Sequence, residues 1–562
     1  MNSAAYSRRE LVLLGIVLAA GIFTRVWLLS HSAVEHFDEG VYASNVYFPP
    51  PDYAYPQQRF YAPPLLPALI EAGMIAGLPP NLAALLPSFL AGCGTIAALW
   101  WLGRSWFGPE VGLAAAALVA LNDFHIAFST TALTDVLLGL WLVLVVDAIG
   151  RSLRDGDYRW AVVAGIYTGL AWWTKYNGWL PLAIEAAALP LLWFLLRPPV
   201  HELRRWAACF ALTALVAALV WCPYYFSLQS QGGYGPIAAN HAKYVVGFAG
   251  WFGSATRQLS NQFAFGIGFI AIGTLLAFAV AARQQQKTWL GLVLGLSSAV
   301  GPVVAAIIVI CLAVSTAGAS IGLARLLVAC HLAPKLDAMW RRRLIGLCLI
   351  AAWWFGMLFA TPLYTPYPRL ALPYLLAAWL ATAINVGAFL PAVEKGFYDL
   401  PLGKFWKWVF LIALGIALIT LACFVRWQDP PPDRRGIERI AQQIHASEPT
   451  NLPRAFYVYG EPAMFFQLRV LGEELVSPVP ELPEAAVTLE GKPIPTFLIA
   501  GPHAWRDPEF HRQLSAALDR WELVNEFDYR PSAIVWLDLN DSRRSPQETA
   551  NDDRVRLYRL RQ

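Results

Sequence analysis

Long apolar runs, separated by short polar segments, follow one another through most of the chain. A helix of about 20 apolar residues spans the roughly 30 Å hydrocarbon core of a bilayer. We therefore predict thirteen helices of this kind, over residues 11–30, 82–103, 109–128, 132–150, 159–175, 178–196, 206–226, 261–282, 288–312, 318–333, 343–361, 370–391 and 405–426. The pattern predicts an α-helical polytopic membrane protein whose membrane domain covers residues 1–426.

The pattern changes in two places. Residues 31–81 form a long loop after the first helix, in which the short apolar run 65–78 is flanked by prolines and predicts an interfacial helix. Residues 427–562 begin with a proline-rich linker. Segments with a helical pattern then alternate with strand-like runs, which predicts a small α/β domain. Its expected helices are 434–447, 461–469 and 507–519, and its expected strands are 455–459, 496–500, 523–529 and 533–537.

Composition supports the membrane assignment. Of the 562 residues, 57% are hydrophobic and 14% are charged, whereas a soluble domain carries about 25% charged residues. The net charge of +4 is small and spread out, so we expect no nucleic-acid partner. Seven cysteines lie inside apolar runs without metal-ligand spacing, which favours small buried side chains over disulfides: Cys93, Cys209, Cys222, Cys311, Cys330, Cys348 and Cys423.

The distribution of basic residues predicts the orientation. Arg8 and Arg9 precede the first run, and further Lys and Arg residues gather in every second loop, while the opposite loops hold far fewer. The basic loops are expected to be cytoplasmic. The N-terminus is then cytoplasmic and the domain 427–562 extracytoplasmic, in a multi-pass protein of the plasma membrane. A twin-arginine signal would look similar, but the length of the run favours an uncleaved helix.

Two adjacent carboxylates, Asp38 and Glu39, stand in the first outer loop. They are either ordinary solvated acids or a catalytic pair. A partly buried carboxylate can act as a general base. Because adjacent residues point in different directions, we expect Asp38 to be the base and Glu39 to bind a metal or orient a partner. A divalent cation is therefore possible, and its ligands stay unknown.

Other charged residues fall at the predicted outer ends of helices. Asp135 is either a first-turn acid that favours the helix dipole or a second site carboxylate. Lys175 and Arg369 either extend to the lipid interface or bind phosphate oxygens. Arg59 adds a weaker positive signal, and His125 is either a polar group at a helix end or part of the site.

Acids beside cations at a lipid boundary fit group transfer from a membrane-embedded phosphate. A base would activate the acceptor, and the cations would stabilise the leaving phosphate. The expected partners are a polyprenyl-phosphate sugar and membrane lipid, with a glycan, lipid or protein as acceptor.

Several motifs resemble those of one family. The order of these motifs is similar to that in GT-C fold glycosyltransferases, in particular the group of protein O-mannosyltransferases and of lipid A aminoarabinose and galacturonic acid transferases. The motifs are His36-Phe37-Asp38-Glu39-Gly40-Val41-Tyr42, Pro63-Pro64-Leu65-Leu66-Pro67, Phe124-His125 through Asp135, Thr174-Lys175 and Tyr367-Pro368-Arg369-Leu370.

The resemblance covers most of residues 10–390 and implies inverting transfer from a lipid-linked sugar. It implies Asp38 as base with Asp135 in support, and Lys175 and Arg369 as ligands of the donor phosphate. His36, Tyr42, His125 and Tyr367 are expected to support the site. One departure is that Thr130 and Thr131 stand where the family often has Arg.

Two other classes remain open. A transporter or flippase of lipid-linked sugars usually binds at the bilayer midplane and often has internal repeats, and no repeat is visible here. An O-antigen polymerase or ligase also uses outer cations. The early acidic pair and the α/β tail argue against it.

Overall fold

The computed structural model describes most of the chain. The described residues are 6–47, 63–230, 232–263, 320, 323–324, 327, 338–365, 367–397, 433–447, 453–532, 534–535 and 554–561. The predicted helices 288–312 and 405–426, most of 261–282 and 318–333, and Arg59 lie outside these residues.

The chain packs as two compact units, each built from separate segments. The first unit comprises residues 1–25, 91–128 and 135–429, and the second comprises residues 26–90, 129–134 and 430–562. The described parts of the loop 31–81 therefore pack with the C-terminal segment. The division at residues 426 and 427 as one between functional domains stays a prediction.

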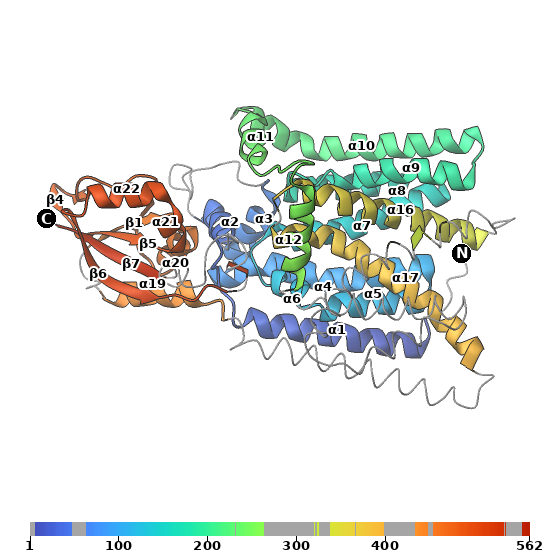
Figure 1. The fold of residues 1–562 in the computed structure, drawn as a ribbon, viewed down its shortest axis with the longest axis horizontal. Coiled ribbons are helices and arrows are strands. Elements are labelled where there is room, and N and C mark those ends of the chain that lie inside the picture. Colours follow the sequence, from blue (N-terminus) through green and yellow to red (C-terminus); the bar gives the residue numbers. More distant parts are fainter. Residues whose placement is uncertain are drawn as a thin grey trace. The chain divides into compact units, whose positions relative to one another are not determined.

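The first unit is helical. Its pairs α8–α10, α5–α17 and α9–α16 pack together, and Figure 1 shows α8, α9 and α10 running alongside one another. The helices that lie wholly or partly in this unit are α1 (Arg8–Leu29), α4 (Pro80–Phe107), α5 (Pro109–Leu121), α6 (Asp123–Phe128), α7 (Thr134–Asp155), α8 (Tyr158–Thr174), α9 (Leu180–Leu196), α10 (Val200–Gln229), α11 (Gly235–Ala242), α12 (Trp251–Phe263), α16 (Ala338–Ala360) and α17 (Leu372–Phe397), with 3-10 turns η3 (Thr361–Leu363) and η4 (Pro368–Ala371).

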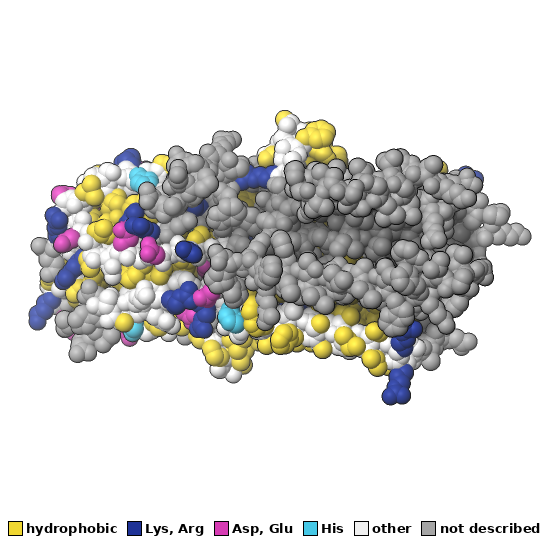
Figure 2. Space-filling view, turned by 60° about the horizontal axis from the view of Figure 1, so that its bottom comes forward, with side chains coloured by type: hydrophobic (Ala, Val, Ile, Leu, Met, Phe, Trp, Pro, Cys, Tyr) yellow, Lys and Arg dark blue, Asp and Glu magenta, His cyan; other side chains and the backbone are white. Residues whose placement is uncertain are grey.

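Five helical stretches of the described residues are long and apolar enough to cross a membrane: Arg8–Leu29, Pro80–Phe107, Thr134–Asp155, Val200–Gln229 and Arg341–Leu363. Shorter apolar helices cover Leu65–Ile75, Pro109–Leu121, Leu180–Leu196 and Arg369–Ile384. Figure 2 shows a hydrophobic strip along α1, where Ile16 and Phe23 are exposed. The chain is thus a multi-pass membrane protein, and the count of thirteen helices stays a prediction.

The predicted helix 109–128 is in fact two helices. Asn122 adopts an extended backbone (φ −75°, ψ 117°) after α5, and its Oδ1 accepts a hydrogen bond of 2.9 Å from the His125 N–H. Asparagine favours this capping role because its side chain satisfies a backbone donor at the start of a helix. The cap starts α6 at Asp123.

The second unit holds two short helices from the loop 31–81, α2 (Phe37–Tyr47) and α3 (Leu65–Ile75). Leu66 and Ile70 of α3 are buried, whereas Ile75 is 81% exposed. One face of α3 thus packs inward while an apolar residue faces outward. The predicted position of this helix at the bilayer surface stays a prediction.

The C-terminal segment folds as a three-layer α/β domain. Its five-stranded sheet has the order β2-β1-β5-β7-β6, in which β1 pairs in parallel with β2 and β5, and β7 pairs antiparallel with β5 and β6. The strands are β1 (Ala455–Tyr459), β2 (Leu475–Pro478), β5 (Thr496–Ala500), β6 (Trp521–Asp528) and β7 (Arg554–Leu560), with a separate hairpin of β3 (Thr488–Leu489) and β4 (Lys492–Pro493). The helices are α19 (Gly436–Ser447), α20 (Pro462–Val470), α21 (Pro502–Arg506) and α22 (Pro508–Ala516).

Alternating side chains of each strand pack on opposite faces of this sheet. Tyr459 and Leu498 meet Trp505 and Phe510 of α21 and α22 in one core. Figure 1 shows α22 and α19 on opposite sides of the sheet. The predicted strands 455–459 and 496–500 match β1 and β5.

One predicted strand is wrong. Ile534 and Val535, inside the expected strand 533–537, are helical. A short apolar run does not by itself distinguish helix from strand. The sheet instead takes β7, in which Arg556 lies 4.1 Å over the Trp505 ring and forms an ion pair of 3.0 Å with Glu526. Because β7 contains three arginines, its sequence did not show the hydrophobic pattern expected of a strand.

Candidate active site

Asp38 and Glu39 both lie in the first turn of α2, where acidic side chains interact favourably with the helix dipole. Their exposed fractions are 5% and 0%. The Asp38 N–H donates a hydrogen bond of 3.1 Å to Nδ1 of His36, which is itself buried, as is Tyr42. Consecutive helical residues point about 100° apart, so the two carboxylates have different surroundings.

Glu39 accepts hydrogen bonds on both carboxylate oxygens. Its Oε2 accepts from the N–H groups of Glu35 (3.1 Å) and His36 (2.8 Å) and from Nη2 of Arg434 (2.5 Å). Its Oε1 accepts from the Ala132 N–H at 2.8 Å. Burial would raise the pKa of Glu39, but Arg434 and the His36 N–H outweigh it, so this pKa lies below its usual value. This geometry fits the orienting role expected of Glu39 better than metal binding.

Arg434 is the residue that completes this cluster. It is 1% exposed, donates from Nη1 to the Thr130 carbonyl at 2.7 Å, and holds its Nε 3.6 Å from Oε2 of Glu35. The other Glu35 oxygen accepts from the Tyr529 hydroxyl at 2.9 Å. Burial raises the pKa of Glu35 despite the Arg434 charge. Arg434 thus ties the start of the C-terminal segment to the turn that carries Asp38.

Arg434 and Glu35 were not among the site residues predicted from the sequence. Arg434 follows the proline-rich linker and adjoins Arg435, whose side chain is 47% exposed. Composition does not separate the buried arginine from the exposed one. The missed signal is a charge at the point where the linker ends, two residues before α19 begins at Gly436.

Gly40 explains how α2 reaches the α/β domain. A Cβ atom at this position would collide with the backbone of Pro462 and Ala463 in α20. Glycine has no Cβ and permits such close approach. The glycine directly after the acidic pair therefore lets α2 pack on the start of α20.

Asp135 and Lys175 form an ion pair in the other unit. Asp135 lies in the first turn of α7 and Lys175 caps the end of α8. The Lys175 Nζ lies 2.6 Å from Oδ1 of Asp135, and the Asp135 side chain is 2% exposed. Within the described residues, Oδ2 of Asp135 has no hydrogen-bond partner. The structure therefore brings together two residues for which separate roles were expected.

Arg369 belongs to an aromatic segment that joins the turn after α16 to the loop around α11. It lies in η4, with its guanidinium 5.8 Å from the ring of Tyr367. The Thr365 N–H donates to the Tyr244 carbonyl at 2.8 Å and the Val246 N–H to the Leu363 carbonyl at 2.9 Å. These bonds hold the two segments together.

A histidine–tyrosine pair lies close to the predicted donor-binding cations. Nδ1 of His241 and the Tyr364 hydroxyl are 2.9 Å apart. Burial lowers the pKa of His241, and the charges of Lys175 and Lys243 lower it further. Burial raises the pKa of Tyr364 to about 12, against the opposing effect of Arg369. Lys175 thus affects the pKa of His241, and Arg369 affects the pKa of Tyr364. Neither member of the pair was predicted from the sequence.

His125 is buried and hydrogen-bonded to Arg25. It is 1% exposed, and its Nδ1 lies 2.8 Å from Nη2 of Arg25. Because a guanidinium only donates, Nδ1 is the acceptor. Arg25 also donates to the carbonyls of Gly21 and Ala120. This geometry matches the alternative of a satisfied polar group at a helix end.

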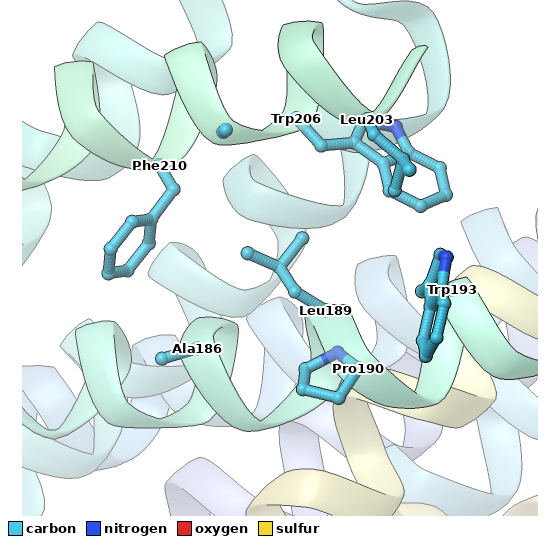
Figure 3. A pocket seen from close by; sticks show the side chains of 8 residues that line it. Ala186, Leu189, Pro190, Trp193, Leu203, Trp206 and Phe210 are labelled. Atoms are coloured by element: carbon cyan, nitrogen blue, oxygen red, sulfur yellow. The ribbon is translucent and has the colours of Figure 1, made fainter. Parts of the chain in front are cut away.

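The described part of the chain shows no metal-binding cluster beside these residues. No group of three or more His, Cys, Asp or Glu residues there could hold a metal ion. Cys93, Cys209, Cys222 and Cys348 are free thiols. A pocket of about 420 Å³ between α9 and α10, seen in Figure 3, is lined only by apolar residues such as Leu189, Trp193 and Phe210. Its lining offers no charged group for a phosphate.

The fold and these residues define a class: a multi-pass membrane protein with an acidic turn in its first loop and a C-terminal α/β domain. The family model of dolichyl-phosphate-mannose-protein mannosyltransferases matches residues 61–225. A comparison with curated protein sequences finds no significant match.

Solved structures extend the likeness to nearly the whole chain. ArnT of Cupriavidus metallidurans, solved with undecaprenyl phosphate, has 13% identity and a TM-score of 0.53, with 99% of this chain and 98% of that chain covered. The oligosaccharyltransferase AglB of Archaeoglobus fulgidus, solved with an inhibitory peptide and dolichol phosphate, has 13% identity and a TM-score of 0.51, with 84% and 64% covered. This chain therefore has the GT-C fold, the fold of polyprenyl-phosphate-sugar glycosyltransferases.

Proposed function

We propose that this protein is an integral membrane glycosyltransferase that moves a sugar from a polyprenyl-phosphate donor to a lipid, glycan or protein acceptor on the outer face of the plasma membrane. The observation that carries the proposal is the buried acidic turn of α2. In this turn the two carboxylate oxygens of Glu39 accept hydrogen bonds from four donors, and Asp38 occupies the adjacent position. A turn held this firmly fixes the position of one carboxylate, as a general base requires.

In this mechanism Asp38 takes the proton of the acceptor hydroxyl. The acceptor oxygen forms a bond to the anomeric carbon while the bond from that carbon to the phosphate oxygen breaks. The configuration inverts because attack comes from the side opposite the leaving group. Polyprenyl phosphate leaves with the electron pair, and the proton stays on Asp38 until it passes to water.

Lys175 and Arg369 are assigned to the donor phosphate. A lysine ammonium has three donors, and Lys175 uses one of them on Asp135 at 2.6 Å. Asp135 would then hold the ammonium in place rather than act on the sugar. The planar guanidinium of Arg369 can bind two phosphate oxygens at once. Both cations stabilise the charge that develops on the leaving phosphate.

The test uses the purified full chain in lipid nanodiscs. Polyprenyl-phosphate sugars carrying mannose, aminoarabinose or galacturonic acid are offered with a peptide, a lipid A disaccharide and an oligosaccharide, and products are identified by mass spectrometry. Asp38→Asn should leave donor binding near normal and lower transfer by about 10²–10⁴-fold. Glu71→Gln is the matched control because Glu71 lies in the same loop, on α3, and is exposed.

Three outcomes would contradict the proposal. Transfer that survives in Asp38→Asn would remove Asp38 from the role of base. Movement of lipid-linked sugar across a vesicle membrane, without any glycosylated product, would identify a transporter or flippase instead. Joining of whole lipid-linked chains would identify a polymerase or ligase.

A further inference from the structure

The α/β domain carries a histidine–carboxylate pair at one edge of its sheet. Glu461 follows β1 and His503 follows β5, and these two strands are neighbouring and parallel. The carboxyl ends of parallel strands lie at the same edge, which is where α/β sheets bind their ligands. The two side chains therefore meet at the position in this domain that is best placed for binding.

Glu461 holds His503 by two hydrogen bonds, one to its backbone and one to its side chain. Its Oε1 accepts from the His503 N–H at 2.7 Å, and its Oε2 lies 3.0 Å from Nδ1 of the imidazole. A carboxylate accepts, so Nδ1 carries the proton and Nε2 presents a lone pair in the neutral ring. The His503 side chain is 25% exposed and that of Glu461 is 6% exposed. Within the described residues, Nε2 of His503 has no hydrogen-bond partner.

This pair lies against the turn that carries Asp38. The rings of Phe37 and His503 have centroids 5.1 Å apart, and Phe37 directly precedes Asp38 in the first turn of α2. The close approach of Gly40 to Pro462 brings α2 onto α20 next to Glu461. Phe37, Glu461 and His503 all belong to the second unit.

A second histidine–carboxylate pair in the same domain differs because its carboxylate also binds an arginine. Nδ1 of His445 lies 2.6 Å from Oε1 of Glu473, but Arg454 also binds both oxygens of Glu473. Arg454 precedes β1 and Glu473 precedes β2, so this cluster lies at the amino edge of the parallel strands. Its carboxylate serves an ion pair rather than a single imidazole.

We propose that His503 binds the acceptor in glycosyl transfer, with Nε2 accepting a hydrogen bond from an acceptor hydroxyl other than the attacking one and Glu461 fixing the tautomer. This inference rests on the proposed function and names the α/β domain as the part of the chain that holds the acceptor. His503 is then a binding residue for a hydroxyl-bearing acceptor, while Asp38 takes the proton.

Three variants test the role by separating acceptor KM from donor KM. His503→Asn keeps a donor near Nδ1 and removes Nε2, while His503→Gln places an amide near Nε2. A neutral hydrogen bond is worth about 0.5–1.5 kcal/mol, so His503→Asn should raise acceptor KM about 2- to 13-fold at unchanged donor KM. His503→Gln should recover part of the loss. Glu461→Gln presents an amide that can donate to Nδ1 and favour the other tautomer, so it should resemble His503→Asn.

His445→Asn is the matched control because it alters the other histidine–carboxylate pair. It should leave acceptor KM unchanged. Chemical modification supplies a readout independent of turnover, since diethylpyrocarbonate reacts with an imidazole lone pair. In the wild-type chain, the acceptor with the highest transfer rate should protect His503 from modification and should not protect His445.

The outcomes distinguish this inference from the proposed function. If the wild-type chain forms no glycosylated product, the proposed function fails and this inference fails with it. If the wild-type chain transfers sugar but acceptor KM is the same in His503→Asn and wild type, only this inference fails. Equal changes of acceptor KM and donor KM in the His503 variants would show a structural role and would also overturn it.

Discussion

Replacing Arg434 by methionine gives the most direct test of the cluster around α2. The side chain keeps its approximate length and loses its charge, which leaves Glu35 and Glu39 buried without their cation. Removing one partner of a buried ion pair costs about 3–5 kcal/mol. At 1.4 kcal/mol for each factor of ten, this lowers the equilibrium constant for folding of the second unit by about 10²–10⁴-fold.

Arg434→Lys should be milder. Lysine keeps the charge but cannot place two nitrogens on the Glu39 carboxylate and the Thr130 carbonyl at once. The loss of one hydrogen bond to a charged group costs about 1.5–3 kcal/mol. The double variant Arg434→Met with Glu39→Gln should be less destabilised than the sum of its parts, because one uncompensated charge is removed.

The assay is urea unfolding of the full chain in nanodiscs, followed by proteolysis within the α/β domain. Arg435→Met is the matched control, because Arg435 is the next residue, is half exposed, and pairs with Glu438 three positions away. Such exposed pairs contribute about 0.3–0.5 kcal/mol. Equal loss of stability in Arg434→Met and Arg435→Met would refute the reasoning.

Three further predictions concern the donor, the orientation and pH. Arg369→Ala should weaken donor binding by about 10- to 150-fold, from a charged hydrogen bond of about 1.5–3 kcal/mol, and Arg369→Lys should recover only part; normal donor binding in both variants would leave Arg369 as an interfacial anchor. A reporter fused at residue 430 should be active only outside the cytoplasm, and cytoplasmic activity would overturn the orientation. Because the pKa of Glu35 is raised in the folded chain, its stabilising contribution is present below the unfolded pKa and is lost as pH rises through the folded pKa. Glu35→Gln should therefore remove this decline in stability from about pH 4.5 upward, as measured by urea unfolding across pH, and an unchanged decline would contradict it.

The sequence determined the elements whose signals are local. Helices such as α1 and α9 followed from apolar runs, and the strands β1 and β5 from hydrophobic periodicity, all within windows shorter than about 30 residues. The Asp38–Glu39 pair was visible because acids are few in the predicted outer loops of the apolar part of the chain. Even so, a local pattern did not separate strand from helix at Ile534 and Val535.

Only the tertiary structure decided which distant groups meet. Arg434 binds Glu39 across 395 positions, and His503 binds Glu461 across 42. Each residue is ordinary in its own segment, since Arg434 adjoins another arginine and His503 lies in a five-residue helix. Periodicity records which side of an element is buried, but not the partner that covers it. The partners follow from the order of strands in the sheet and from the close approach that Gly40 allows, and both arise only when the folded segments pack together.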